Sequence, residues 1–293
     1  MKCIKVPRRE LGRIRIRVAP GYQIIFDGDF ALIPVLEPQQ GYEAVECSPA
    51  PKETTPKLRD LIPNVSSFYV IGDIMVLSPK KEIIKAELEK LLKLRRGVRS
   101  IYIRKRVSGE LRINELEHVA GEKRTVTEFR EGGLRFIVDI AKVYVNPSMA
   151  TERLRLVKSI PEGSRVLDVF TGYGALAIHV ARKIGYVVAG DLNLDGLYMA
   201  RESLRLNSCR ISMDLVQYDA RYLPFREKSF DWVIGDNPTM INVFLQELCR
   251  VSRKFTVVYR LGALEEGWER VNDYSKDLVI AKRVIRCQDK DVY

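Results

Sequence analysis

The second half of the chain alternates short apolar runs with amphipathic segments of helical length. The apolar runs are residues 165–170, 186–191, 213–217, 230–236 and 254–259, and the helical patterns are residues 175–184, 194–206 and 241–251. Strands that alternate with helices in this way pair in parallel, and the helices then cover both faces of the sheet. The pattern therefore predicts an α/β fold for this half.

The first half has a different organisation. Residues 1–47 alternate apolar and polar positions in short runs, which predicts a small β-rich module, and residues 48–64 contain four prolines and resemble a linker. A strand pair, an amphipathic helix and two further strands are then predicted at 68–77, 80–95, 99–106 and 134–145. We therefore expect three domains, at 1–50, 65–145 and 146–293.

Positive charge is concentrated before the second half begins. Residues 1–165 hold 31 lysines and arginines against 21 acids, whereas residues 166–293 hold 18 against 17. Local clusters lie at 8–17, 90–99 and 104–106. The asymmetry favours a protein that binds a polyanion with one part and performs chemistry with another. The alternative is a basic surface that only serves solubility.

Several classes of protein are disfavoured. No stretch reaches the roughly 18 apolar residues of a membrane span, and the charged start, MKCIKVPRRELGR, lacks a signal core. We therefore expect a cytoplasmic protein without membrane contact. The five cysteines are scattered and form no CxxC pair, which predicts reduced thiols without zinc. His118 and His179 are far apart in the sequence, so we expect no metal.

The first strand-to-helix turn of the second half has the features of a cofactor site. Asp168 ends a buried run, and Gly172 and Gly174 follow before the next helical segment. Glycines let the backbone approach a ligand, and the start of a helix presents unpaired N–H groups. The turn has neither the GxGxxG pattern of dinucleotide sites nor the GK[ST] of phosphate loops.

Two further acids follow the neighbouring runs. Asp191 ends the second, where a carboxylate can accept the hydroxyls of a ribose, and Asp219 follows the third, where it can accept the amine of an adenine. Three acids at successive strand ends, without a phosphate cradle, predict a site for S-adenosylmethionine. The alternative is three helix-capping acids in an unrelated α/β fold. We also expect cofactor contacts from Phe170, Asn193 and Ala220.

Three stretches resemble one enzyme family. They are GELRINELEHVAGEKRTVTEFREGGLRFIVDIAKVYVNPSMATERLRL (109–156), SFYVIGDIMVL (67–77) and VLDVFTGYGALAI (166–178). They resemble the archaeal and eukaryotic tRNA (guanine(37)-N(1))-methyltransferases, and weaker similarity extends over most of the chain. The resemblance implies a Rossmann-like class I methyltransferase domain preceded by two small α+β domains, the first of which touches the outer corner of the tRNA. We expect a monomeric enzyme that binds and modifies tRNA.

The resemblance also implies two catalytic roles. The family uses a glutamate of an ER motif to remove the N1 proton and an arginine of a GEhR motif (h apolar) to stabilise charge on O6. These correspond to Glu152 in ATERLR and Arg112 in GELR. Without the resemblance, Glu152 would be interpreted as a local helix carboxylate and Arg112 as a phosphate contact.

The chain departs from the family pattern at two places. Asp236, Asn237 and Pro238 replace Asn-Leu-Pro beside the methyl group and the target base, and DNPT also resembles the [DN]PP[YF] motif of enzymes that methylate exocyclic amines. Ser148 replaces an arginine that grips the cofactor's carboxylate, an arginine that the related wyosine aminocarboxypropyltransferase also lacks. The alternatives are aminocarboxypropyl transfer to a wyosine-type precursor, methylation of such a precursor, or a weakened tRNA-binding paralogue. The run ELEHVAGE (115–122) favours the methyltransferase.

Overall fold

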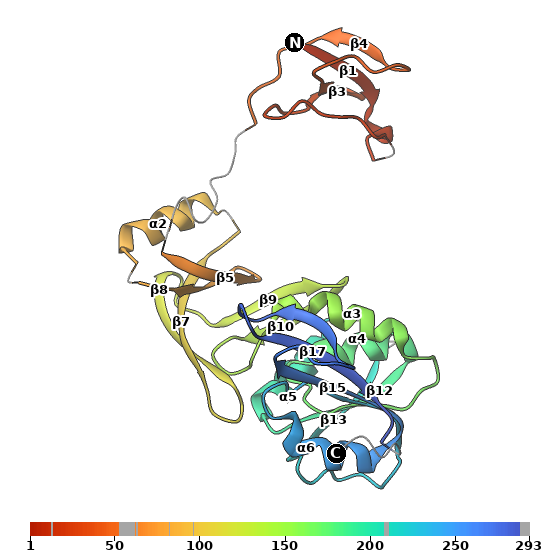
Figure 1. The fold of residues 1–293 in the computed structure, drawn as a ribbon. Coiled ribbons are helices and arrows are strands. Elements are labelled where there is room, and N and C mark those ends of the chain that lie inside the picture. Colours follow the sequence, from red (N-terminus) through yellow and green to blue (C-terminus); the bar gives the residue numbers. More distant parts are fainter. Residues whose placement is uncertain are drawn as a thin grey trace. The chain divides into compact units, whose positions relative to one another are not determined.

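The computed structural model describes residues 1–12, 14–52, 62, 64–81, 83–95, 97–207 and 211–287. The chain divides into two units, residues 1–61 and residues 62–293 (Figure 1). Most of the proline-rich segment that we interpreted as a linker lies outside the described residues. Among the helices of the described ranges, none is long and apolar enough to cross a membrane.

The first unit is built on a four-stranded antiparallel sheet in the order β2-β3-β1-β4. Its strands are β1 (Lys2–Pro7), β2 (Ile25–Asp27), β3 (Phe30–Pro34) and β4 (Glu43–Glu46), and the short 3-10 helix η1 (Arg8–Glu10) follows β1. Alternate residues of β1, Ile4 and Val6, pack with Ile33 and Val35 in a small apolar core. The predicted β-rich module is therefore present.

The second unit begins with another four-stranded sheet, in the order β5-β6-β7-β8. Its strands are β5 (Val65–Ile71), β6 (Ile74–Pro79), β7 (Ser100–Ser108) and β8 (Ile113–Gly121), with helix α2 (Lys85–Leu94) between β6 and β7. Ile71, Ile74 and Val76 of this sheet belong to the same apolar core as helix α4 (Ala175–Ile184). The expected boundary at residues 145 and 146 stays a prediction.

A seven-stranded sheet forms the rest of this unit, in the order β13-β12-β11-β14-β15-β17-β16. Its strands are β11 (Val166–Asp168), β12 (Tyr186–Asp191), β13 (Ser212–Gln217), β14 (Phe230–Gly235), β15 (Ser252–Gly262), β16 (Glu269–Asp273) and β17 (Val279–Ile285). Strands β11 to β15 pair in parallel, and β17 is inserted antiparallel between β15 and β16. The predicted α/β fold is confirmed.

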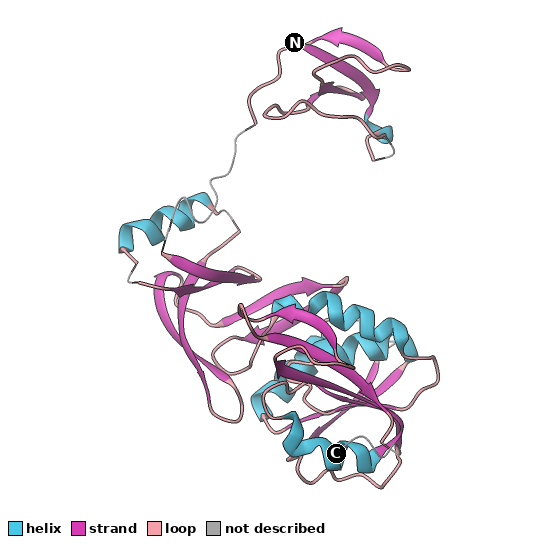
Figure 2. Ribbon diagram, in the orientation of Figure 1, coloured by secondary structure: helices cyan, strands magenta, loops and turns pink. Residues whose placement is uncertain are grey.

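Helices cover both faces of this sheet (Figure 2). Successive residues of a strand point to opposite faces, so Val166 packs in the core with α4 and α5 (Leu194–Arg205), whereas Leu167 packs with α6 (Ile241–Val251). The hairpin β9 (Val126–Glu131) and β10 (Leu134–Asp139), the 3-10 turn η2 (Pro147–Met149) and helix α3 (Ala150–Ser159) precede β11. This arrangement brings the carboxyl ends of β11, β12 and β14 to one edge, where ligands bind in open α/β sheets.

The expectation of reduced cysteines is wrong for four of the five. Cys3 is bonded to Cys47, and Cys249 is bonded to Cys287, across sequence separations of 44 and 38 residues. Pairing of β1 with β4 brings the Cα atoms of Cys3 and Cys47 to 5.8 Å, within the range of a disulfide. Sequence spacing does not reveal such pairs, and the cysteine argument for a reducing compartment is removed. Cys209 lies outside the described residues.

Candidate active site

The turn after β11 is shaped by its glycines. Gly172 and Gly174 both have positive φ values, 52° and 83°, which favour glycine. Gly174 also caps α4, and a Cβ atom there would lie 3.0 Å from the Cβ of Ala200. Gly172 lines both of the pockets described below, but Gly174 lines neither, so its observed role is to let the helix pack closely.

Asp168 ends β11 and is only 1% exposed. Its Oδ2 atom has no hydrogen-bond partner among the residues that the structure describes. Burial, together with the nearby charges of Asp236 and Asp191, raises the pKa of Asp168 to about 7 against the opposing effect of Thr171. An unpaired buried carboxyl is costly unless a ligand satisfies it, so Asp168 is suited to a cationic ligand group.

Asp191 ends β12 and holds the glycine turn in place. Its Oδ2 accepts a hydrogen bond of 2.8 Å from the N–H of Gly172, and its Oδ1 accepts one of 2.9 Å from the N–H of Asn193. Asn193 caps α5 by accepting from the N–H of Asp195, and its Nδ2 donates to the carbonyl of Lys142. Both predicted residues therefore lie at the site, and Asn193 has an evident structural role there.

One pocket opens beside Asp191. Its wall combines apolar side chains with two predicted acids and includes Phe170, Leu192, Met240, Phe244, Asp191 and Asp219. Ala220 also lines it. Hydrogen bonds from Arg221 lower the pKa of Asp219, and Arg221 makes a second ion pair of 3.2 Å with Glu110 in the β7–β8 turn. A pocket that combines apolar side chains with two acids is suited to a nucleoside.

A second pocket adjoins the first and shares part of its lining with it. It is lined in part by Asn146, Arg153, Asp168, Tyr173, Asp236 and Pro238. The hydroxyl of Tyr173 is buried and has no hydrogen-bond partner within the described ranges, and burial raises the pKa of Tyr173 to about 12. Asp168 provides an acceptor, Tyr173 a donor and Arg153 a cation in the same pocket. Such a pocket is suited to a zwitterionic group.

Arg112 and Asp236 line both pockets and therefore mark the junction between them. Arg112 lies in the turn between β7 and β8 with φ of 54°, and its guanidinium is 5.0 Å from the ring centre of Tyr144. Its Nη1 donates to Thr239 Oγ1 at 2.5 Å, and Thr239 in turn donates to Asn237 Oδ1. Burial raises the pKa of Asp236 to about 6, against the opposing charges of Arg153 and Arg112.

Glu152 lines neither pocket. Its side chain is 3% exposed. Its Oε1 accepts 2.8 Å from Lys282 Nζ and 3.2 Å from the hydroxyl of Tyr259, and its Oε2 lies 3.4 Å from Arg155. The glutamate that the resemblance implies as a base is therefore engaged with three donors.

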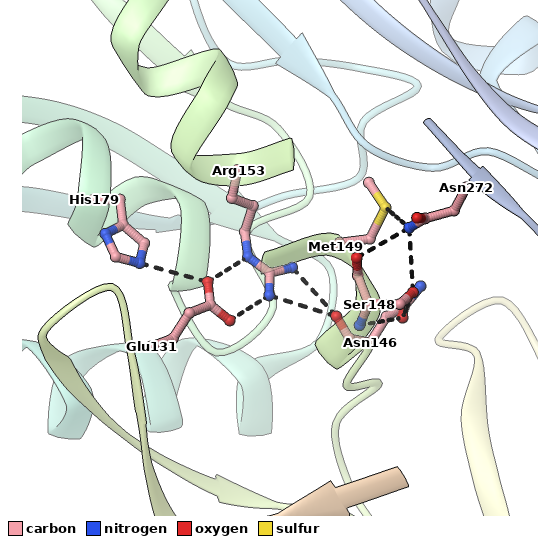
Figure 3. A network of polar contacts seen from close by, with 7 residues as sticks. All are labelled: Glu131, Asn146, Ser148, Met149, Arg153, His179 and Asn272. Atoms are coloured by element: carbon pink, nitrogen blue, oxygen red, sulfur yellow. Dashed lines mark hydrogen bonds and ion pairs between the residues drawn. The ribbon is translucent and has the colours of Figure 1, made fainter. Parts of the chain in front are cut away.

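A buried network supports the second pocket (Figure 3). Arg153 binds Glu131 through Nε at 2.8 Å and Nη2 at 2.5 Å, and also donates to the carbonyl of Asn146. Burial alone would raise the pKa of Glu131, but its contacts with His179 and Arg153 outweigh burial and lower the pKa to about 2. Ser148 lines neither pocket. Its hydroxyl donates to Oδ1 of Asn146, and its carbonyl accepts a hydrogen bond from Nδ2 of Asn272 on β16.

Sequence reasoning missed several residues that shape the site. They are Arg153, Tyr218, Thr239, Tyr259 and Lys282. Arg153 follows Glu152 directly in ATERLR, a motif that was already singled out, whereas Lys282 lies 130 residues from its partner Glu152 and carries no local signal.

In the described part of the chain, no three His, Cys, Asp or Glu side chains are grouped so that they could hold a metal.

Comparison with known proteins identifies the family. The model of the TRM5/TYW2 methyltransferase domain matches residues 127–282. The chain belongs to this family. The tRNA (guanine(37)-N(1))-methyltransferase Trm5b of Pyrococcus abyssi is 31% identical over 97% of this chain and 94% of that protein, and the Trm5b of Methanocaldococcus jannaschii is 33% identical over 75% and 66%.

The fold agrees with this TRM5/TYW2 assignment. The crystal structure of Trm5b from Pyrococcus abyssi matches with a TM-score of 0.69 at 27% identity, and the match covers 97% of this chain and 99% of that one. The resemblance inferred from residues 67–178 and the Rossmann-like class I methyltransferase fold are both confirmed.

Proposed function

We propose that this protein is an S-adenosylmethionine-dependent tRNA methyltransferase that methylates N1 of guanosine 37, next to the anticodon. The observation that carries the proposal is the junction of the two pockets, where Arg112 and Asp236 stand together. The names of the family relatives support the substrate. The acids that follow strand ends, Asp168, Asp191 and Asp219, favour S-adenosylmethionine as the cofactor.

The residues present fit the cofactor. Asp191 would accept the ribose hydroxyls, Asp219 the adenine amine, and Phe170 would contact the adenine ring. The unpartnered atoms of Asp168 and Tyr173 would receive the ammonium and the carboxylate of the amino-acid tail. When bound, S-adenosylmethionine supplies an electrophilic methyl group on a sulfonium.

The chain's own residues prepare the target base. Arg112, held by Thr239, would donate to O6 of guanine and stabilise the negative charge that develops when N1 loses its proton. Asn237 and Pro238 follow Asp236 and would border the base. Arg153 fixes the carbonyl of Asn146 and keeps the wall of the second pocket rigid.

The basic first part of the chain would bind the tRNA. Residues 1–50 would form the domain that contacts the outer corner, residues 65–145 a middle domain and residues 146–293 the methyltransferase domain. Charge on β7 supports this division, because Arg104, Lys105 and Arg106 lie on the strand that leads into the Arg112 turn. We also propose that the enzyme acts as a monomer.

The test is to incubate the protein with cofactor labelled in the methyl group and separately in the aminocarboxypropyl group, together with a tRNA pool. Mass spectrometry of the digested nucleosides should show 1-methylguanosine. Aminocarboxypropylated nucleoside would instead indicate the wyosine branch, for which the loss of an arginine at Ser148 is the supporting observation. Binding of both partners without any product would indicate a non-catalytic tRNA-binding paralogue.

A further inference from the structure

The turn between β7 and β8 reaches the first pocket. Glu110, Leu111 and Arg112 all line that pocket, although the turn joins two strands of the four-stranded sheet. The N–H of Arg112 donates to the carbonyl of Gly109 at 3.1 Å, which closes the turn. Arg112 has a φ of 54°, a left-handed conformation that residues with a side chain rarely adopt. The position of Arg112 therefore depends on contacts that hold the turn from outside.

One arginine holds two carboxylates at this pocket. Arg221 follows β13, and its Nε and Nη2 atoms lie 2.9 Å and 2.8 Å from Oδ2 of Asp219. Its Nη2 atom also lies 3.2 Å from Oε1 of Glu110, two residues before Arg112. A guanidinium presents five N–H donors in a rigid fork, so it can bind two carboxylates at once. Arg221 therefore connects Asp219, the predicted adenine acceptor, to the turn that carries Arg112.

The turn has a second anchor at the side chain of Arg112. Its Nη1 atom donates to Thr239 Oγ1 at 2.5 Å, and Thr239 comes from the segment after β14. The contact with Thr239 fixes the end of the Arg112 side chain, whereas the contact of Arg221 with Glu110 fixes the backbone of the turn. Both contacts matter for catalysis, because a displacement of about 1 Å at a catalytic group can lower a rate by about 10²-fold.

The ion pair of Arg221 and Glu110 is partly exposed. The two side chains are 40% and 50% exposed, and such a pair adds little to folding stability because water screens it. Both residues line the first pocket, so a nucleoside in that pocket would displace water beside them. The attraction between two charges strengthens as their surroundings lose water. The ion pair should therefore strengthen when the cofactor is bound, which is when Arg112 has to be in place.

We propose that Arg221 is a positioning residue that couples cofactor binding to the placement of Arg112. When the cofactor fills the first pocket, Asp219 orients Arg221, and Arg221 binds Glu110. Glu110 then holds the turn so that Arg112 donates to O6 of the target guanine. Arg221 itself touches none of the reacting atoms. The inference rests on the proposed function of this site.

The experiment measures single-turnover methylation of tRNA at saturating cofactor. Glu110→Gln removes the charge that Arg221 binds and should lower the rate about tenfold, while calorimetry with the thioether product of the cofactor shows affinity within about threefold of wild type. In an Arg112→Ala background the same substitution should change the rate by less than about twofold, because no guanidinium is left to position. Glu128→Gln breaks a comparably exposed ion pair with Arg135, is the matched control and should behave as wild type.

A second variant, Arg221→Met, tests the other end of the link. It leaves both carboxylates without the guanidinium, so the rate should fall about tenfold, as in Glu110→Gln. Cofactor affinity should also weaken about fivefold, because Asp219 loses the donor that orients it. The double variant should be no slower than Arg221→Met alone, since both substitutions break the same link.

Each outcome decides the assignment. A rate for Glu110→Gln within about twofold of wild type overturns the proposal, and so does an equal loss in the Arg112→Ala background. A double variant whose loss is the product of the two single losses also overturns it, because Arg221 and Glu110 would then act independently. Wild type that produces no 1-methylguanosine refutes the proposed function itself, and this result is distinguishable because it precedes any substitution.

Discussion

Lys282 Nζ lies 2.8 Å from Glu152 Oε1, and both side chains are more than nine-tenths buried. Lys282 comes from β17, the antiparallel strand inserted near the end of the sheet, and Glu152 comes from α3. The ion pair therefore links helix α3, which precedes the cofactor turn, to strand β17 of the sheet. It also explains why a motif glutamate can be present without facing the pockets.

Removing one partner of this pair should destabilise the protein. Lys282→Met leaves Glu152 buried without its ammonium, and breaking a buried pair in this way typically costs about 3–5 kcal/mol. The double variant Glu152→Gln with Lys282→Met removes both charges and should recover more than half of that loss. Denaturant unfolding measures both. If the single variant is less stable by under about 0.5 kcal/mol, the pair is not structural.

The buried carboxylate of Asp168 should lower the free energy of unfolding at neutral pH and strengthen cofactor binding. Its pKa of about 7 in the folded protein exceeds the value of about 4 in an unfolded chain, so stability should fall as pH rises between these values. Asp168→Asn should therefore raise the melting temperature by a few degrees at pH 8 and leave it nearly unchanged at pH 4. Calorimetry with the thioether product of the cofactor should show weaker binding. Unaltered affinity would reject the predicted contact with the tail.

Arg112 should contribute mainly to the chemical step. Arg112→Ala removes a donor aimed at developing charge, so the single-turnover rate should fall by about 10²–10³-fold. Binding of tRNA, measured by filter retention, should weaken far less. Arg201→Ala, an exposed arginine on α5 that is paired with Glu202, is the control. Equal losses of rate and tRNA affinity would assign Arg112 to a phosphate contact instead.

The basic strand β7 should contribute to tRNA affinity through charge. Lys105 pairs with Glu117 at 2.9 Å and Arg106 with Glu115 at 2.7 Å, and all four side chains are exposed. Replacing Arg104, Lys105 and Arg106 with alanine should weaken binding and reduce the slope of log K against log salt by about one for each lost phosphate contact.

The partner acids provide the reciprocal test of this surface. Glu115→Gln with Glu117→Gln frees Lys105 and Arg106 from their ion pairs, so tRNA binding should become tighter. A salt slope that is the same in the triple alanine variant as in wild type would place the tRNA contact on another surface.

The sequence predicted the elements that depend on local pattern. The bounds of α4 and α6 and of β12 were predicted without error, because a helical stripe or an apolar run between turn residues is visible within a dozen positions. The hairpin β16–β17 was not predicted. Strand β16 is polar and half exposed, whereas β17 is mostly buried and was missed despite its apolar residues. Strand β1, at the very start of the chain, was also missed.

The candidate site was only partly predictable for a related reason. Asp168, Asp191 and Asp219 follow strand ends, and their place on a common edge follows from parallel topology. The engagement of Glu152 depends on Lys282 and Tyr259, which are 130 and 107 residues away. The disulfides likewise depend on the pairing of distant strands and helices, and no local pattern encodes that pairing.

The most direct test of the account uses two transcripts of one tRNA that differ only at position 37, one with guanosine and one with adenosine. After reaction with methyl-labelled cofactor, the digested products are mapped by mass spectrometry. We expect one methyl group per molecule, on N1 of guanosine 37, and no labelling of the adenosine transcript. Equal labelling of both transcripts, or a methyl group on another atom or position, would contradict the account.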